Sequence, residues 1–67
     1  MNDVEFYAIT YSSDGLEYKE SYEDLEDAKD DFNYYVSHPE YYDYAVLQYV
    51  RYEDGYEYIE IIDDWFN

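Results

Sequence analysis

Carboxylates are the most numerous side chains in this protein that could do chemistry. Nineteen Asp and Glu residues face three Lys and Arg residues, which gives a formal charge of −16 on 67 residues. Carboxylates can act as general acids or bases, bind cations, or present negative charge to a positive partner. They form two main groups, and Asp14, Glu17 and Glu20 form a smaller third one. The main groups are Glu23, Asp24, Glu26, Asp27, Asp30 and Asp31, and then Glu53, Asp54, Glu57, Glu60, Asp63 and Asp64.

The residue types argue against an enzyme. Two carboxyl groups can act as an acid and a base when a concave, water-poor pocket separates their pKa values. A chain of 67 residues leaves little room for such a pocket. The single histidine, His38, precedes Pro39 at the end of a predicted helix, where a structural role is the ordinary one. With two glycines and no GxxxxGK[ST] or GxGxxG motif, the chain offers no phosphate-binding loop. We therefore predict no enzymatic activity, no catalytic residues and no cofactor.

A dedicated calcium site is not expected either. An EF-hand loop needs acids at alternating positions, then a glycine and a distal glutamate. The segment DAKDDFNYY lacks the glycine, and EDGYEYIE has it in the wrong place. We predict weak cation binding by an acidic surface and no metal-binding residues.

Tyrosine is the second unusual feature, with thirteen residues in the chain. Exposed tyrosines among acids can stack on arginine guanidinium groups and anchor interfaces. The alternative is that tyrosine simply suits β-strands. The tyrosines around His38-Pro39 cannot all face inward, and we expect contact surface from Tyr34, Tyr35, Tyr41, Tyr42 and Tyr44.

Two hairpins are predicted to position these side chains. Residues 4–11 (VEFYAITY) and 16–20 (LEYKE) flank a turn at 12–15, where Asp-Gly supplies the positive φ angles of a tight hairpin. This turn pairs Tyr11 with Tyr18 and Ile9 with Glu20. One face would then carry Tyr7, Ile9, Tyr11, Leu16 and Tyr18, and the other Phe6 and Ala8.

The second hairpin repeats the pattern, since DGLEYKE at 14–20 and DGYEYIE at 54–60 share the form DG-x-EY-x-E. The similarity indicates either convergent hairpin chemistry or an internal duplication. Residues 43–52 (DYAVLQYVRY) and 56–62 would pair Val50 with Ile59, Arg51 with Tyr58 and Leu47 with Ile62. We expect the core face to carry Val46, Val50, Ile59 and Ile61, and the tail DDWFN to fold Trp65 or Phe66 over a sheet edge.

A helix is predicted between the hairpins, from Tyr22 to about Ser37. Ser21 is the expected N-cap, with Asp24 at the capping-box position. The apolar stripe is Tyr22, Leu25, Ala28, Phe32 and Tyr35 or Val36, and Pro39 ends the helix.

These elements predict an α+β fold: ββαββ, a four-stranded, mainly antiparallel sheet with one helix packed on one face. No linker divides the chain, so residues 1–67 form one predicted domain. The N-terminus does not have the pattern of a signal peptide, and no apolar run approaches the roughly 20 residues of a membrane span. We expect a soluble, cytoplasmic protein.

The acid spacing is comparable with that of nucleic acid. Six carboxylates across nine helical residues span roughly 12 Å. Duplex DNA carries about seven charges over that length. The alternative is that the acids are a solvated face that keeps the protein in solution. Lysine is nearly absent and the formal charge is −16, so we favour a functional role for the acids. Their negative electrostatic field repels nucleic acid and attracts basic protein surfaces.

In size, acidity, aromatic content and lack of catalytic residues, the chain resembles small acidic inhibitors of host defence encoded by bacteriophages and mobile elements. That class includes anti-CRISPR proteins, anti-restriction proteins and uracil-DNA glycosylase inhibitors. The resemblance covers the whole chain but rests on no diagnostic motif, so it carries over no site residues. It implies a DNA-mimicking protein that acts in the cytoplasm of a bacterial host cell.

We therefore predict an inhibitor that binds the DNA- or RNA-binding surface of a CRISPR effector, restriction enzyme or DNA-repair enzyme. It would not bind nucleic acid or membrane, and pairing of two copies through an edge strand is left open. Its contact residues would be the two main acid groups and the five tyrosines named above. The alternative is an accessory subunit or chaperone that binds a basic protein without mimicry.

Overall fold

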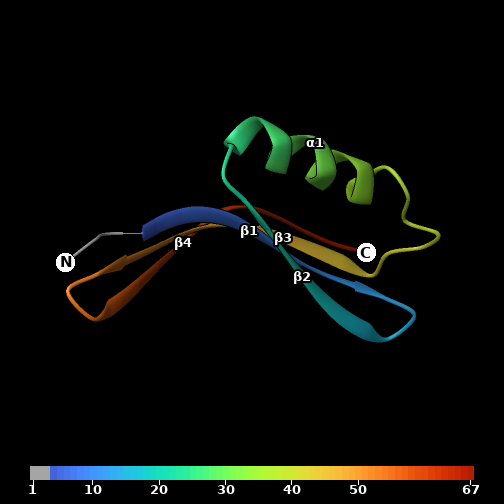
Figure 1. Cartoon of the computed structure of the whole chain (residues 1–67). Coiled ribbons are helices and arrows are strands. Elements are labelled where there is room, and N and C mark those ends of the chain that lie inside the picture. The colour runs from blue at the N-terminus through green and yellow to red at the C-terminus, as the bar shows by residue number, and fades with distance from the viewer. Residues whose placement is uncertain (1–3) are drawn as a thin grey trace.

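A computed structural model describes residues 4–67 and contains four strands and one helix in the order ββαββ (Figure 1). The elements are β1 (Val4–Ser13), β2 (Leu16–Tyr22), α1 (Leu25–Val36), β3 (Tyr44–Glu53) and β4 (Tyr56–Phe66). The strands form one antiparallel sheet in the order β2-β1-β3-β4, and α1 lies on one face. The predicted α+β fold is confirmed. The single-domain prediction also includes residues 1–3, which lie outside the described residues.

Both hairpins close through the Asp-Gly turns that the sequence indicates. Asp14 and Gly15 have φ angles of 55° and 76°, and Asp54 and Gly55 have 52° and 81°. Positive φ at two successive residues defines the turn that matches the right-handed twist of paired strands. The turns therefore fix the register of each hairpin locally.

That register agrees with the prediction near both turns. Tyr11 lies opposite Tyr18, and Val50 lies opposite Ile59. The predicted pairs Ile9–Glu20 and Arg51–Tyr58 are also present. The pairing of β1 with β3 joins the two hairpins into one sheet.

Farther from the second turn the register shifts by one residue. Gln48 pairs with Ile61 but Leu47 pairs with Asp63, so the predicted Leu47–Ile62 pair is wrong. The irregularity is a β-bulge, which inserts an extra residue in one strand. As a result Trp65 lies opposite Ala45 and packs against the core, as a member of β4 rather than as a tail folded over an edge.

The helix begins later than predicted. Asp24, not Ser21, is the N-cap, and its Oδ1 accepts a hydrogen bond from the backbone N–H of Glu26 at 3.1 Å. Ser21 and Tyr22 continue β2, because their backbone pairs with β1. Ser37 is the C-cap, so the helix ends just before His38-Pro39, as predicted.

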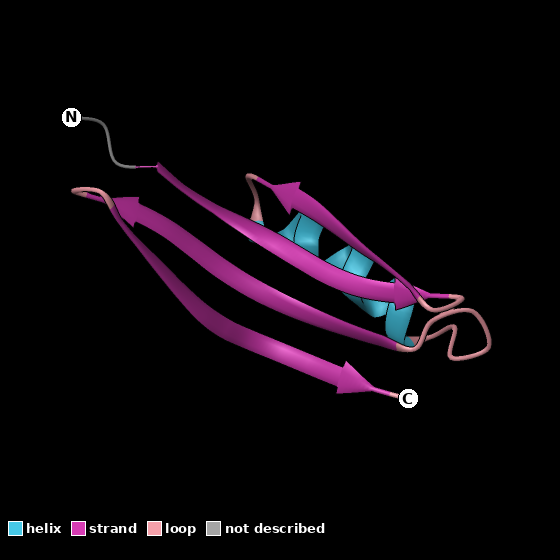
Figure 2. Cartoon of the chain, turned by 90° about the horizontal axis from the view of Figure 1, so that it is seen from below, coloured by secondary structure: helices cyan, strands magenta, loops and turns pink. Residues whose placement is uncertain are grey.

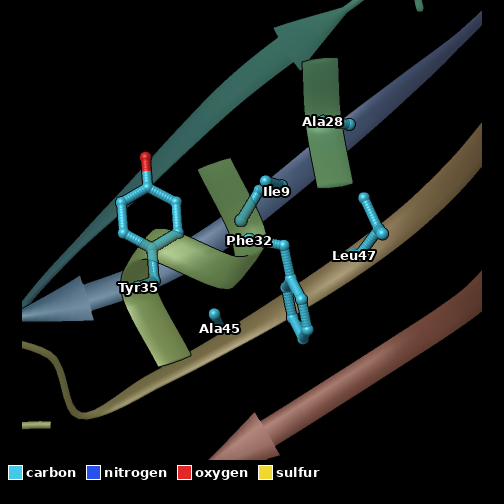
Figure 3. Close-up of a cluster of buried hydrophobic side chains, with 6 residues drawn as sticks. All are labelled: Ile9, Ala28, Phe32, Tyr35, Ala45 and Leu47. Carbon is cyan, nitrogen blue, oxygen red and sulfur yellow. The ribbon is translucent and has the colours of Figure 1, made fainter. Parts of the chain in front are cut away.

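The core lies between α1 and the strands beneath it (Figure 3). Its buried members are Ile9, Ala28, Phe32, Tyr35, Ala45 and Leu47. The apolar side of α1 thus follows the predicted stripe, and Tyr22 reaches the same core from β2. Burying a large apolar side chain stabilises a fold by about 1.5–3 kcal/mol, so this small set carries much of the stability.

The predicted core face of the second hairpin is wrong. Ala45 and Leu47 point toward the helix, whereas Val46 and Val50 alternate to the other side of the sheet. Ile59 and Ile61 share that side and are 49% and 58% exposed. Val50 is nevertheless buried, since larger side chains flank it on the same face.

We call this second side of the sheet the open face, because no described element covers it (Figure 2). On the central strands it carries Val4, Phe6, Ala8, Thr10 and Ser12 from β1 and Tyr44, Val46, Gln48, Val50 and Tyr52 from β3. On the edge strands it carries Glu17, Lys19 and Ser21 from β2 and Glu57, Ile59, Ile61, Asp64 and Phe66 from β4.

Candidate acidic binding surface

The first acid group lies on the helix and on the segment that leads into it. Ala28, Phe32 and Tyr35 face the core, so the intervening acids point outward. Glu23 and Asp24 precede the helix and are also exposed. We call the exposed carboxylates of α1 the acidic helix face, which consists of Glu26, Asp27, Asp30 and Asp31.

Like charges are close together on the acidic helix face. Glu26 and Asp30 are four residues apart, and so are Asp27 and Asp31. Side chains at this spacing are neighbours, with Cβ atoms about 5–6 Å apart, and like-charge pairs destabilise a helix by a few tenths of a kcal/mol. The helix dipole offsets part of this cost at Glu26 and Asp27 in the first turn, but not farther along.

Few cations neutralise these charges. Among residues 4–67 the one ion pair joins Arg51 Nε to Glu53 Oε2 at 3.3 Å, on the far hairpin. Arg51 also lies over the Tyr58 ring, 5.2 Å from its centroid. Lys29 is the single basic residue within α1. The acidic helix face is therefore a largely uncompensated patch of negative charge.

Two acids of the first group have structural roles as well. Asp24 caps the helix, as described above. Asp31 Oδ2 accepts a hydrogen bond of 2.7 Å from the Tyr22 hydroxyl. Burial, and next this bond to the carboxylate, raise the pKa of Tyr22 well above its ordinary value. Asp27 and Asp30 have no such hydrogen bond in the described residues, which leaves their carboxylates free for a partner.

The second acid group does not form one surface. Strand alternation places Glu60 and Asp63 on the helix side of the sheet, but Glu57 and Asp64 on the open face. Asp54 sits in the turn, and Glu53 is held near Arg51. The second acid group is therefore divided between the two faces of the sheet, because side chains alternate along a strand.

The predicted tyrosine surface also divides. Tyr35 is buried and stacks on Tyr11 with ring centroids 4.3 Å apart, so it offers no contact surface. Tyr42 is half-buried and packs edge-on against Tyr35 at 4.9 Å. Both tyrosines were predicted as contact residues, and Tyr35 also as a member of the apolar stripe. In the structure both rings pack against the core that α1 forms with β1 and β3.

Tyr34 and Tyr41 remain exposed beside the helix end. Tyr34 is 52% and Tyr41 63% exposed, and the His38 ring lies near both, 4.2 Å from Tyr34 and 6.5 Å from Tyr41 between centroids. Together these two tyrosines can add stacking contacts next to the acidic helix face. Tyr44 lies apart, on the open face, where its ring is tilted against that of Phe66 with centroids 5.8 Å apart.

Several tyrosine hydroxyls donate to carboxylates across strands, a pattern that sequence reasoning missed. Tyr49 donates to Glu5 at 2.6 Å, Tyr44 donates to Glu17 and Tyr52 donates to Glu57. In each case the bond to the carboxylate is the largest cause that raises the pKa of the tyrosine. The Tyr52–Glu57 pair was readable from the hairpin register, whereas the others required the pairing of β1 with β3.

Other kinds of site are not found in the described part of the chain. Residues 4–67 form no pocket and contain no cluster of three or more His, Cys, Asp or Glu side chains suited to a metal ion. No helix in this range is long and apolar enough to cross a membrane. Comparison with family models, curated proteins and solved structures gives no match.

Proposed function

We propose that this protein is an acidic inhibitor that occupies the positively charged DNA- or RNA-binding surface of a nucleic-acid enzyme. The observation that carries the proposal is the acidic helix face, whose four exposed carboxylates lack a matching set of cations. Such a surface attracts the same basic groove that attracts phosphates. A CRISPR effector, a restriction enzyme or a DNA-repair enzyme fits this description of a target.

The arrangement of the helix supports this reading over a purely solubilising role. Acids spaced four apart weaken the helix, and dispersed acids would give the same solubility without that cost. Docking on the core through Phe32 and Ala28 holds the charges on a fixed element. A rigid display avoids the ordering cost that a flexible acidic tail pays on binding.

The exposed tyrosines extend the contact beyond charge. Tyr34 and Tyr41 lie at the end of the helix and present ring faces that can stack on arginine. Aromatic anchors surrounded by polar groups are the usual source of binding energy in an interface. The acids would then speed association, and the tyrosines would slow dissociation.

Neutralising the free helix acids tests the proposal. Asp27→Asn with Asp30→Asn removes two charges and disturbs no hydrogen bond of the described residues. The control pair, Asp14→Asn with Glu40→Gln, removes the same charge from exposed positions outside α1. With a target captured from bacterial lysate, we expect the helix pair to weaken binding about tenfold or more, and the control pair to have a much smaller effect. Equal effects would mean that net charge, not the helix, determines binding.

Competition with nucleic acid tests mimicry itself. DNA or RNA should displace the protein from its target, and binding should weaken as salt rises. Simultaneous binding of nucleic acid and this protein to one target would instead support the accessory-subunit alternative. If the protein captures only unrelated basic proteins, all released at low salt, both the mimicry proposal and the accessory-subunit alternative are contradicted.

A further inference from the structure

The open face is large, uncharged at its centre and unoccupied by any described element. Its ten positions on β1 and β3 carry no charged side chain, although the chain has a formal charge of −16. Ile59, Ile61 and Phe66 extend the apolar surface onto β4, and all three are exposed. An apolar surface of this extent in so acidic a protein indicates an interface.

We propose that the open face is a homodimer interface, in which two copies pack face to face as a β-sandwich. This inference does not depend on the proposed function. The size of the surface is sufficient: the two longer dimensions of the molecule are 44 and 23 Å, and they outline a face on the order of 1,000 Å², against about 800 Å² per partner in a stable complex.

The distribution of acids favours a second copy as the occupant. The helix and its acids lie on the other side of the sheet, so packing two open faces together turns both acidic helix faces outward. A basic partner would find no acids on the centre of this face. The two chains repel at long range, but the surfaces in contact are the least charged ones.

Charges at the edges of the open face select the orientation of the second copy. One row across the sheet runs from β2 to β4 through Lys19, Thr10, Val46 and Asp64, each residue paired with the next. Lys19 and Asp64 therefore occupy one row, at opposite edges of the sheet. A two-fold axis parallel to the strands places β2 of each copy over β4 of the other.

This orientation brings each Lys19 toward Asp64 of the second copy. The aligned packing of sheets, about 10 Å apart and within about 30° in direction, lets two such pairs form at the rims of the interface. An axis running across the strands would place like edges together, with the acids of β4 facing each other. The charge pattern thus favours the first arrangement.

Sedimentation equilibrium over a range of protein concentration provides the first test. We expect a monomer–dimer equilibrium that shifts toward dimer as salt rises, because salt screens the repulsion between two acidic chains. Binding to a basic target has the opposite salt dependence, so the two proposals fail independently. A wild-type protein that stays monomeric at its highest soluble concentration, at low and high salt, would overturn the dimer.

Charge variants test the orientation. Lys19→Glu should weaken the dimer about tenfold, since each of two symmetric rim pairs becomes repulsive. Adding Asp64→Lys to Lys19→Glu restores the net charge and should restore association. Lys29→Glu changes the net charge equally but lies on the helix, and should leave the dimer nearly unchanged. Equal loss with Lys19→Glu and Lys29→Glu, without rescue by the double variant, would contradict the arrangement.

Zero-length cross-linking and apolar variants provide tests that do not depend on charge balance. A carbodiimide joins amines to carboxylates in contact, and Lys19 and Asp64 of one chain lie three strand spacings apart, about 14 Å. A Lys19–Asp64 cross-linked peptide from a covalent dimer is therefore the expected product.

Ile59→Ser with Ile61→Ser should abolish the dimer, whereas Leu16→Ser, equally exposed on the helix side, should retain it. An unchanged dimer in the double isoleucine variant would place the interface elsewhere.

Discussion

Among residues 4–67, four tyrosine hydroxyls donate to carboxylates, at Asp31, Glu5, Glu17 and Glu57. In most proteins lysine and arginine would satisfy such acids, but only three such residues are present here. A tyrosine donates a hydrogen bond without adding positive charge. Tyrosine therefore fixes acids in place while the net charge stays strongly negative.

The Tyr22–Asp31 bond is the one that ties the sheet to the helix. Tyr22→Phe removes the hydroxyl and keeps the ring in the core, so we expect the free energy of unfolding to fall by about 1 kcal/mol. Denaturant unfolding measures the change. Tyr41→Phe is the control, since its ring is exposed and its hydroxyl has no hydrogen-bond partner within residues 4–67. Equal stabilities of the two variants would show that the bond contributes nothing.

Tyrosine ionisation sets the behaviour at high pH. Burial is the main cause that raises the pKa values of Tyr22 and Tyr35 above the ordinary value of 10.0. The folded state favours the neutral hydroxyls, so stability is complete below about pH 10 and falls as pH rises above it. Unfolding measured from about pH 9 to pH 11 should show this fall. The slope should be shallower in Tyr35→Phe, and an identical slope would argue against the assignment.

The helix start illustrates what local sequence could and could not predict. The Asp-Gly turns predicted the register of both hairpins near each turn, because residues close in sequence determine it, but they did not predict the bulge farther along β4. Ser21 and Asp24 are both good N-caps, and pairing of Ser21 with Ala8 decides between them. That pairing depends on how far β2 continues along β1, which local propensity does not encode.

The assignment of faces failed for a similar reason. Val46, Val50, Ile59 and Ile61 alternate as a core face should, yet the helix covers the side that carries Ala45 and Leu47. Both sides of β3 are apolar, so the pattern alone could not choose between them. The exposed helix acids were predictable, because amphipathic periodicity in 25–36 separates them from Ala28 and Phe32.

The cap itself can be tested with a matched pair of substitutions. Asp24→Ala removes the side chain that accepts from the Glu26 N–H, and should lower stability by about 1 kcal/mol. Asp24→Asn loses the same charge but keeps a capping oxygen, so it should remain near wild type. Thermal unfolding monitored by circular dichroism compares the two. Equal losses would show that the charge, not the cap, is what matters at this position.

At the scale of the whole molecule, self-repulsion opposes folding. Nineteen acids lie on a chain with a Cα radius of gyration of 12.7 Å, and unfolding lets them move apart. Raising the ionic strength from about 0.01 M to about 0.15 M shortens the Debye length from about 30 to 8 Å and should raise the melting temperature. Asp27→Asn with Asp30→Asn should raise stability at low salt and reduce this salt dependence. A melting temperature that falls with salt would contradict the argument.

The bulge opposite Leu47 and Gln48 determines which face of the sheet each later side chain of β4 occupies. Side chains alternate with a period of two, so one extra residue exchanges the two faces for everything that follows it. Without it, continuing the register of Val50 and Ile59 would place Asp64 opposite Ala45, facing the core, and Trp65 opposite Tyr44. Ile62 is the residue left without a partner in this ladder, so deleting it keeps Asp63, Asp64 and Trp65 in their observed pairings. Inserting one alanine after Asp63 should instead exchange the faces of Asp64 and Trp65, and should destabilise the protein far more than deleting Ile62, as measured by denaturant unfolding. In this part of β4 the number of residues after Ile61 determines which side chains face the core, so loss of the bulge residue should be tolerated where an insertion is not.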